Sequence, residues 1–486
     1  MGWESMWIWF LFGAVFAEVQ AGERLLNSTD GMNVLFIIVD DLRTTLGCYG
    51  DAVVKTPNID QLSSQSVVFQ NAYAQQAVCA PSRVSLLTGR RPSTTKLFDF
   101  NSYWRVHAGN YSTMPQYFKE NGYVTMSVGK VFHPGITGNH SDDYPYSWSI
   151  PPYHPSSEKY ENQKACKSKD GKLHANLVCP VDVTEVPEAT LPDIQSTKEA
   201  IRSLHSVKKH NSSFFLAVGY HKPHIPFRYP KEYKKLYPME NLTLAPDPHI
   251  PEGLPPVAYN PWMDIRERED VQALNVSFPY GPIPKHFQLL IRQSYFASVS
   301  YMDAQVGQLL SALDSLEFTN TTIVVFTSDH GRNRNVVVEL VSIFATVSEL
   351  VGLPVPPDCP ESSFHIALCT EGASLVPHFN VSDEDDDELI ESVAYSMYPR
   401  PSDIPQWNSD RPDLKDIKIM GYSIRTIDYR YTIWVTYNPT NFTPTFQDVH
   451  AGELYFVEDD PNQDNNLYNR SMHDALSSKL FAFMRP

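Results

Sequence analysis

Four short apolar runs, each followed at once by residues that carry charge or exchange protons, constrain this chain most. They cover residues 33–39, 123–128, 214–218 and 322–326. Continuous apolar runs of this length are typical of strands buried on both faces of a sheet. Stretches with helical spacing separate them. We therefore predict an α/β fold with a large, mostly parallel or mixed sheet flanked by helices.

Acidic residues follow the first and last of these runs. Asp40 and Asp41 end the first, and Asp329 and His330 end the last. The carboxyl ends of neighbouring parallel strands form the usual ligand-binding edge of such a sheet. Buried carboxylates are costly without a positive partner, although an exposed turn with a helix cap would also explain Asp40 and Asp41 alone. Three carboxylates and an imidazole suit a hard divalent cation, and oxygen-rich ligands favour Ca²⁺ over Zn²⁺.

The two middle runs end in basic residues. Lys130 and His133 follow one, and His221, Lys222 and His224 follow the other. A single histidine is more often a structural residue than a functional one. Acids, a lysine and histidines at four strand ends together indicate a site that binds an oxyanion and transfers protons.

The rest of the chain divides into helices, loops and a smaller C-terminal unit. Helical spacing is found at 59–66, 114–121, 194–205, 287–316 and 336–353. Residues 134–192 and 223–285 are rich in Pro, Tyr and His, and we interpret them as ordered loops that cover the site. Alternating residues at 421–427 and 429–437 predict an antiparallel hairpin, with a strand at 453–457 and a helix at 474–484. The acidic run 382–388 marks the predicted boundary between a catalytic domain, 23–381, and a C-terminal subdomain, 382–486.

Several features indicate the secretory pathway. Residues 1–22 resemble a signal peptide, although Glu4 is atypical and the apolar block is too short to span a bilayer. The later apolar stretch 336–353 is interrupted by charged and polar residues, so we expect no membrane span. Ten Asn-x-Ser/Thr sites support glycosylation: Asn27, Asn110, Asn139, Asn211, Asn241, Asn275, Asn320, Asn380, Asn441 and Asn469.

The six cysteines indicate which disulfides can form, and the net charge indicates which kinds of partner the chain can bind. Cys166 with Cys179, and Cys359 with Cys369, are close in sequence and predicted to pair, although sequence alone does not determine connectivity. Cys48 is interpreted as a packed free thiol. The formal charge of −17 argues against a nucleic-acid partner but permits a local site for an anion, and a pI of about 5.4 suits an acidic compartment.

The remaining cysteine, Cys79, begins the stretch Cys79-Ala80-Pro81-Ser82-Arg83 that continues to Thr88-Gly89-Arg90. This stretch closely resembles the signature of type I sulfatases, and the resemblance extends over nearly the whole chain. It is carried further by residues 37–51, 129–135, 221–230 and 398–407. The resemblance implies the alkaline-phosphatase-like sulfatase fold.

In that family the cysteine is oxidised to formylglycine by a formylglycine-generating enzyme, a covalent change that the one-letter code does not show. The resemblance implies a Ca²⁺ site formed by Asp40, Asp41, the modified Cys79, Asp329 and His330. It is strongest to members that remove the 2-O-sulfate of iduronate in heparan sulfate and dermatan sulfate. It therefore implies glycosaminoglycan oligosaccharides as substrates and a lysosomal location, reached through a sorting receptor that recognises N-glycans.

The implied reaction uses the hydrated aldehyde of formylglycine as the nucleophile toward sulfur, activated by Ca²⁺ and Asp329. Arg83 and Lys130 hold the oxygens of the hydrate and the sulfate, and His224 protonates the leaving sugar oxygen. His133 then removes a proton from the second hydroxyl, and sulfate is expelled.

One departure from the family follows Gly331. Family members continue there with a stretch that supplies a second lysine, whereas this chain has no lysine between Gly331 and Lys415. By resemblance, roughly fifty to sixty residues are missing, a loss of the kind that destabilises a domain severely. A spliced or mispredicted product explains this best; the alternative is that Arg332 or Arg334 replaces the lysine, although arginine cannot act as a proton donor.

Two other functions stay open at this point. A metal-dependent phosphatase or phosphodiesterase of the same superfamily would use Ser or Thr in place of Cys79 and bind two metals. A catalytically impaired form would keep the Ca²⁺ site and the glycans without turning over substrate.

Overall fold

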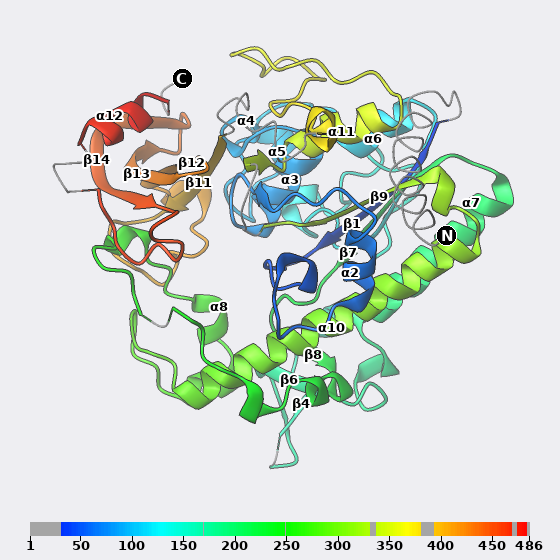
Figure 1. The fold of residues 1–486 in the computed structure, drawn as a ribbon, viewed down its shortest axis with the longest axis horizontal. Coiled ribbons are helices and arrows are strands. Elements are labelled where there is room, and N and C mark those ends of the chain that lie inside the picture. The colour runs from blue at the N-terminus through cyan, green and yellow to red at the C-terminus, as the bar shows by residue number, and fades with distance from the viewer. Residues whose placement is uncertain are drawn as a thin grey trace, which may run out of the picture.

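The computed structural model describes residues 31–168, 170–247, 249–330, 337–380, 393–468 and 474–483. The four predicted strands form one parallel sheet in the order β3–β7–β1–β9 (Figure 1). Their bounds are Asn33–Val39 for β1, Val124–Gly129 for β3, Phe214–Tyr220 for β7 and Thr322–Ser328 for β9. The predicted α/β fold is confirmed.

Helices cover both faces of this sheet because alternate residues of each strand point in opposite directions. On one face Val34, Phe36 and Ile38 pack with residues of α3 (Cys79–Thr88), α6 (Met114–Glu120) and α11 (Ser342–Leu350). On the other, Leu35, Ile37 and Val39 pack with α2 (Pro57–Ser63), α7 (Pro192–His210) and α10 (Lys285–Ser315). Every residue of β1 and β7 is buried, which explains their continuous apolar sequence.

The predicted helix at 336–353 is wrong in its first part. Val337–Glu339 is a strand, β10, that pairs in parallel with β2 (Asn71–Tyr73), and α11 begins only at Ser342. The consecutive valines favour an extended backbone, and the Glu339 carboxylate accepts hydrogen bonds from Arg91, Gln75 and the Tyr395 amide. These distant partners decide the local structure.

The two predicted loops contain short elements as well as turns. In 134–192, β4 (Cys166–Lys167) pairs with β5 (Leu173–His174), and β6 (Val178–Val181) follows. In 223–285, β8 (Phe227–Pro230) pairs with β6, and the short helices α8 (Met263–Arg266) and α9 (Glu269–Gln272) follow. Strands of two to four residues leave no periodic pattern in a sequence, which is why they were not predicted.

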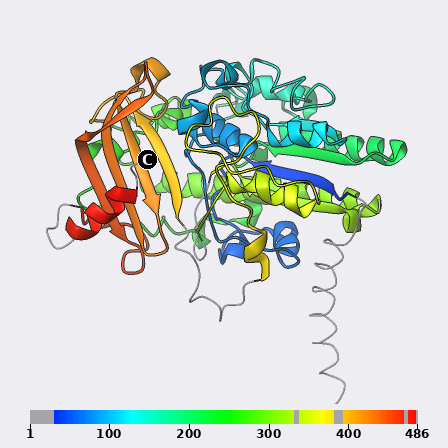
Figure 2. The same cartoon turned by 90° about the horizontal axis from the view of Figure 1, so that it is seen from above.

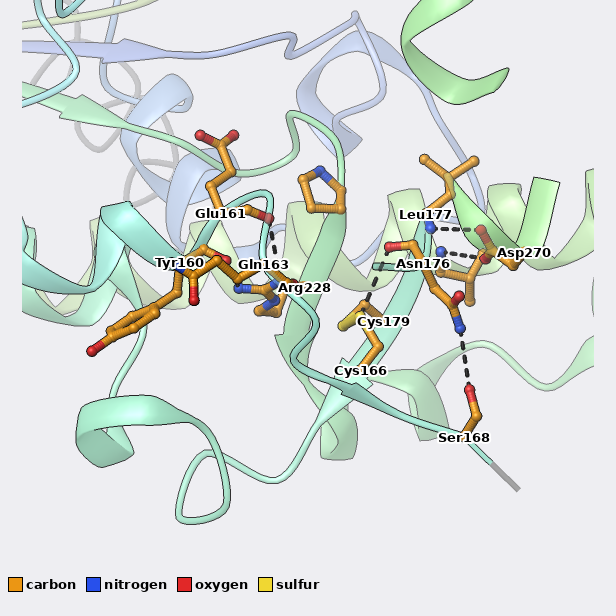
Figure 3. The surroundings of a disulfide bond; sticks show 12 residues. Tyr160, Glu161, Gln163, Cys166, Ser168, Asn176, Leu177, Cys179, Arg228 and Asp270 are labelled. Atoms are coloured by element: carbon orange, nitrogen blue, oxygen red, sulfur yellow. Dashed lines mark hydrogen bonds between the residues drawn. A yellow bond between two sulfur atoms is a disulfide. The ribbon is translucent and has the colours of Figure 1, made fainter. Parts of the chain in front are cut away.

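Both predicted disulfides are confirmed. Cys166–Cys179 joins β4 to β6, and Cys359–Cys369 closes a surface loop, while Cys48 and Cys79 are unpaired. Beside the first disulfide, the Arg228 guanidinium donates to the carbonyls of Tyr160, Glu161 and Gln163 (Figure 3). The disulfide and Arg228 therefore hold one connected segment against β8.

A second, antiparallel sheet stands at one end of the molecule, with α12 (Asp474–Phe483) on its outer side (Figure 2). Its strands follow the order β11–β12–β13–β14, with bounds Ala394–Arg400, Ile419–Arg425, Tyr429–Asn438 and Thr443–Phe456. The predicted hairpin and terminal helix are observed, and β14 begins earlier than the predicted strand. Backbone hydrogen bonds connect β11 to the α/β unit, for example from Met397 N to Gln75 O at 2.8 Å.

Some predictions fall outside the described residues, namely the signal peptide at 1–22 and the acidic boundary at 382–388. Within the described ranges, no helix is both long and apolar enough to cross a membrane. Among the described residues, these glycosylation sites are exposed, which suits attachment of a glycan: Asn110, Asn139, Asn211, Asn241, Asn320 and Asn441. Asn275 is exposed as well.

We expect the Cys166–Cys179 disulfide to contribute substantially to stability, because it closes a loop with a sequence separation of 13. Replacing both cysteines by serine should lower the free energy of unfolding by about 2–4 kcal/mol, measured by chemical denaturation. Cys48→Ser is the matched control, since Cys48 has no disulfide partner and should change stability much less. Equal losses in the two variants would contradict the assignment.

Candidate active site

The carboxylates of Asp40 and Asp329 lie side by side because their strands are in register. Val39 is paired with Ser328, so the residues that follow leave the sheet together. Asp40 N donates to Tyr220 O at 3.0 Å and Asp329 N donates to Val39 O at 3.1 Å, which continues the sheet by one residue on each strand. Both residues are fully buried. The sheet itself therefore positions this acidic pair.

Asp41 turns out of the sheet in a left-handed conformation, with φ 56, which a residue other than glycine adopts at some cost. Two contacts hold it there. Asp41 N donates to Asp329 Oδ1 at 3.1 Å, and the Tyr295 hydroxyl donates to Asp41 O at 2.9 Å. The turn directs the Asp41 carboxylate toward solvent, and its side chain is 33% exposed.

Cys79 and Arg83 reach the acidic pair from α3. Cys79 is the first residue of this helix and Arg83 lies one turn later, so both side chains occupy one face. Cys79 Sγ donates to Asp40 Oδ1 at 3.2 Å. Arg83 Nη2 lies 3.0 Å from Asp40 Oδ1, and Arg83 Nε lies 3.2 Å from Asp329 Oδ2.

The second terminal nitrogen of Arg83, Nη1, donates to the carbonyls of Lys130 and Val131. Protein oxygens thus surround all three guanidinium nitrogens. Arg83 therefore joins the ends of three strands, β1, β9 and β3, into one cluster.

Lys130 enters the site where β3 and β7 approach each other closely. Gly129 has φ +74, and a Cβ there would lie 2.3 Å from Gly219 O, so both features require glycine. Lys130 N donates to Gly219 O at 3.0 Å, and its ammonium group pairs with Asp40 Oδ2. The close approach therefore directs the Lys130 side chain at Asp40.

His224 lies at the entrance, on the loop between β7 and β8. Its Nε2 is 3.5 Å from Asp41 Oδ2, and its Nδ1 is 3.7 Å from Glu161 Oε1 and hydrogen-bonded to Ile225 O. Lys222 supports the loop by donating to the carbonyls of His224 and Pro226. One nitrogen of His224 is thus anchored, and the other faces the acidic cluster.

The charges at this site nearly cancel. Three carboxylates, Asp40, Asp41 and Asp329, meet Arg83, Lys130 and His330. Burial opposes ionisation of Asp40, but Lys130, His224 and Arg83 outweigh it and hold the Asp40 pKa well below its usual range. Burial also opposes charge on His330, yet Asp329 and Asp41 raise its pKa to about 9.

Two groups at the site are neutral near pH 7. Burial and the charge of Asp40 raise the pKa of the Cys79 thiol well above its ordinary value, so the unmodified residue is a poor nucleophile. Burial and the nearby Lys130 ammonium lower the pKa of His133 to about 3. The His133 Nδ1 makes no hydrogen bond within the described structure, and its ring lies 4.7 Å from that of Phe100. His133 is therefore neutral and keeps one ring nitrogen without a hydrogen bond.

The donor set fits a hard divalent cation. One ligand atom each from Asp40, Asp41 and Asp329 lies within 4.8 Å of the others, and Asp41, Cys79 and His330 form a second such group. Carboxylate oxygens are the ligands that Ca²⁺ prefers. A cation here would also relieve the mutual repulsion of three carboxylates, two of which are fully buried.

Every predicted site residue that the structure describes belongs to this cluster: Asp40, Asp41, Cys79, Arg83, Lys130, His133, His224, Asp329 and His330. Arg332 and Arg334, the alternative sources of a second cation, lie outside the described residues. Sequence reasoning did not identify the supporting roles of Tyr295, Lys222 and Glu161. No local signal would have revealed Tyr295, since it holds Asp41 from a helix 254 positions away.

A row of alternating acidic residues and histidines supports the loop that carries His224, and it contacts this loop at His221 and Lys222. His154 lies 3.2 Å from Asp142 and 3.6 Å from Glu158, and buried His221 lies 3.3 Å from Glu158 and 3.5 Å from Asp193. Asp193 also accepts hydrogen bonds from the backbone amides of His221 and Lys222. Burial opposes charge on His221, but Asp193 and Glu158 outweigh it and raise its pKa to about 9.

Comparison with known proteins identifies the family. Residues 32–348 match the family model described as Sulfatase. The chain is 60% identical to proteins named iduronate 2-sulfatase from Mus musculus, over 541 residues, and from Homo sapiens, over 544. These alignments cover 98% of the mouse and human proteins, and 98% and 99% of this chain.

A solved structure shares the fold at much lower identity. A protein in complex with its substrate D-glucosamine-2-N,6-O-disulfate aligns with a TM-score of 0.64 and 19% identity, covering 94% of this chain and 97% of its own. This likeness concerns the fold alone.

The alignment with the mouse protein also reveals an internal difference in length. It spans 541 residues, whereas this chain has 486, so at least 55 aligned positions have no counterpart here. Because the alignment reaches 98% of both chains, those positions are internal. An internal shortening of the predicted size is therefore confirmed.

We expect Arg83→Ala to be strongly destabilising, because it leaves the buried carboxylates of Asp40 and Asp329 without their shared partner. Loss of one member of a buried ion pair costs about 3–5 kcal/mol, and denaturant unfolding should reveal a loss of this size. The matched control is Arg43→Ala, whose side chain is exposed. If Arg83→Ala lowers the free energy of unfolding by less than about 1 kcal/mol, Arg83 does not stabilise the buried carboxylates as we infer.

The His221 contacts predict a pH dependence of stability. A raised folded-state pKa stabilises the fold fully below the unfolded value of about 6.5, and this contribution is lost as pH rises through about 9. His221→Asn should therefore reduce the free energy of unfolding by roughly 1–3 kcal/mol more at pH 6 than at pH 9.5. Exposed His210→Asn is the control. A loss independent of pH in His221→Asn would overturn the assignment.

Proposed function

The chain belongs to the sulfatase family of sulfuric ester hydrolases, and we propose that it removes the 2-O-sulfate from iduronate residues of heparan sulfate and dermatan sulfate. The observation that carries this proposal is the 60% identity with two iduronate 2-sulfatases along almost their whole length. The position of Cys79, in contact with a cation-binding cluster at the ends of three strands, supports it.

Two groups complete the proposed site. A formylglycine made from Cys79 would supply a hydrated aldehyde, a better nucleophile than the neutral thiol. Ca²⁺ would be held by Asp40, Asp41, Asp329, His330 and the modified residue 79, and would supply positive charge next to the sulfate ester. The oxygen-rich ligands support this choice of metal over Zn²⁺.

We assign the remaining roles, which are positioning, sulfate binding and proton transfer, to side chains of this chain. Arg83 already has protein acceptors at every guanidinium nitrogen, so we assign it to holding the acidic ligands and the attacking oxygen in place. Lys130 binds the sulfate oxygens as a point charge. His224 faces the acidic cluster with Nε2 and donates a proton to the leaving sugar oxygen, while neutral His133 accepts a proton so that sulfate can be expelled.

The proposed route to the substrate begins in the secretory pathway. A formylglycine-generating enzyme would modify Cys79, and N-glycans at the exposed sites would present the protein to a lysosomal sorting receptor. Protonation of histidines in an acidic lysosome would reduce the net negative charge of −17. Sulfated glycosaminoglycan oligosaccharides would be the partners there.

One observation favours a second candidate, a catalytically impaired form that keeps the cation site. At least 55 positions of the mouse relative have no counterpart here, and no lysine occurs between Gly331 and Lys415. The cation ligands do not depend on that stretch, because Asp329 and His330 are in place. Binding of Ca²⁺ without turnover is the behaviour that this candidate predicts.

Activity on a 2-sulfated iduronate disaccharide tests the proposal. Secreted protein produced with abundant formylglycine-generating enzyme should hydrolyse it, and Cys79→Ala should lose at least about 10³-fold in kcat/KM, because the nucleophile is absent. Peptide mass spectrometry should find the aldehyde at residue 79. Cys48→Ala is the matched control and should retain activity.

Two outcomes separate the candidates. Wild-type activity equal to that of Cys79→Ala, with a Ca²⁺-dependent rise in Tm that Asp41→Ala removes, would favour the impaired form. An unmodified thiol at residue 79, together with activity that survives Cys79→Ala, would reject the formylglycine mechanism.

A further inference from the structure

Strand β9 ends the parallel sheet, and its outer edge is open among the described residues. In the order β3–β7–β1–β9, β9 pairs only with β1. Six of its seven residues are partly exposed. An unpaired strand edge presents a row of N–H and C=O groups that can pair with another strand.

The register with β1 shows which backbone groups of β9 face outward. Asp329 N donates to Val39 O, so the backbone groups of Asp329 face β1. Because these groups point to opposite edges in successive residues, those of Val324, Phe326 and Ser328 face away from β1. Within the described ranges, Val324 and Phe326 make no backbone hydrogen bond on that outer side.

The opposite edge of the same sheet, formed by β3, is covered. Thr125 O accepts a hydrogen bond from Ser149 N at 2.9 Å, and Ser127 O accepts one from Tyr153 N at 2.9 Å. The loop that carries Ser149 and Tyr153 thus takes the place of a further strand. In the part of the sheet that the structure describes, only the β9 edge is left for pairing.

The sequence of β9 lacks the features that protect edge strands. Such strands commonly carry lysine, proline or a bulge. Thr322–Ser328 reads Thr-Ile-Val-Val-Phe-Thr-Ser, with no charged residue, no proline and no glycine. Its β-branched and aromatic residues favour an extended, paired backbone. Pairing at this edge therefore brings no like charges together within the strand, in spite of the net charge of −17.

This sequence is also self-complementary about its middle residue, Val325. In an antiparallel pair centred there, Val324 lies opposite Phe326 of a second copy, and Thr322 lies opposite Ser328. Apolar side chains then meet apolar ones, and hydroxyl groups meet hydroxyl groups. Since the backbone groups of Val324 and Phe326 point outward, each such pair can exchange two N–H···O=C bonds.

Segments of the chain outside the described ranges suit this edge less well. Residues 331–336 join β9 to β10, and six residues are too few for both a turn and a strand along the seven residues of β9. The run 382–388 contains six acidic residues. Residues 1–22 resemble a signal peptide, and 23–30 carry three charged residues and a glycosylation site. A second copy of β9 therefore fits the edge better than these segments.

We propose that the outer edge of β9 pairs with β9 of a second copy of this chain, antiparallel and centred on Val325, in a symmetric dimer. The two four-stranded sheets then become one continuous sheet. Because the β3 edges at its two ends are covered, association stops at two copies. The dimer does not depend on the proposed function, since none of the predicted site residues belongs to β9.

The mass of the secreted, glycosylated protein in solution tests the dimer. Light scattering across a dilution series should give twice the mass of one chain at high concentration and dissociation on dilution. Val324→Pro removes an outward N–H without removing a hydrogen bond to β1, so it should raise the dissociation constant of the dimer at least about 10-fold. Wild type that is monomeric at every concentration, or that forms assemblies larger than a dimer, overturns the proposal.

A cysteine on the symmetry axis tests the pairing even if the proline variant does not fold. The Cα atoms of a non-hydrogen-bonded antiparallel pair lie about 4.5 Å apart, within the range of a disulfide. Val325→Cys should therefore give a covalent dimer under mild oxidation, seen on a non-reducing gel. Ile323→Cys, on the same face of β9, is the matched control and should not cross-link, because Thr327 of the second copy lies opposite it. A covalent dimer in both variants, or in neither, overturns the pairing.

The glycosylation site at Asn320, two residues before β9, defines one further outcome. The variant Asn320→Gln removes this site. If wild type is monomeric and only Asn320→Gln forms the dimer, a glycan shields the edge in the secreted protein, and the proposal is rejected. Equal dissociation constants for the two proteins support it.

Discussion

The ion cluster of Arg83 with Asp40 and Asp329 is the interaction on which the rest of the site depends. Both carboxylates are fully buried, and neither would be stable there without the guanidinium 3.0–3.2 Å away. Because the same guanidinium also binds the carbonyls after β3, one side chain fixes three strand ends and the start of α3. The geometry around Cys79 follows from that arrangement.

The burial of each element explains how far the fold could be predicted. Strand β1 has the predicted bounds because all seven of its residues are buried, which leaves an uninterrupted apolar run. Helix α10 was recognisable because its 31 residues repeat an apolar face many times. Strand β10 was mistaken for a helix because three residues are too few to show the alternating pattern of a strand. The residues that bind Glu339 also lie far away in sequence.

The candidate active site was predictable where a residue directly follows a strand, and not where a side chain distant in sequence supports that residue. Asp40, Lys130 and Asp329 directly follow strands, so the parallel sheet alone brings them to one edge. The conformation of Asp41 depends on Tyr295 in the middle of α10. Nothing in the sequence around Tyr295 distinguishes it from an ordinary residue of an amphipathic helix.

The edge position of β9 bears on what the shortened chain can still do. Six of its seven residues are partly exposed, whereas every residue of β1 and β7 is buried, and among the described residues β9 pairs only with β1. Yet the backbone of β1 holds Asp329 through Val39 O, and α3 holds it through Ser82 and Arg83. The carboxylates that could hold a cation are therefore positioned without a further strand beyond β9.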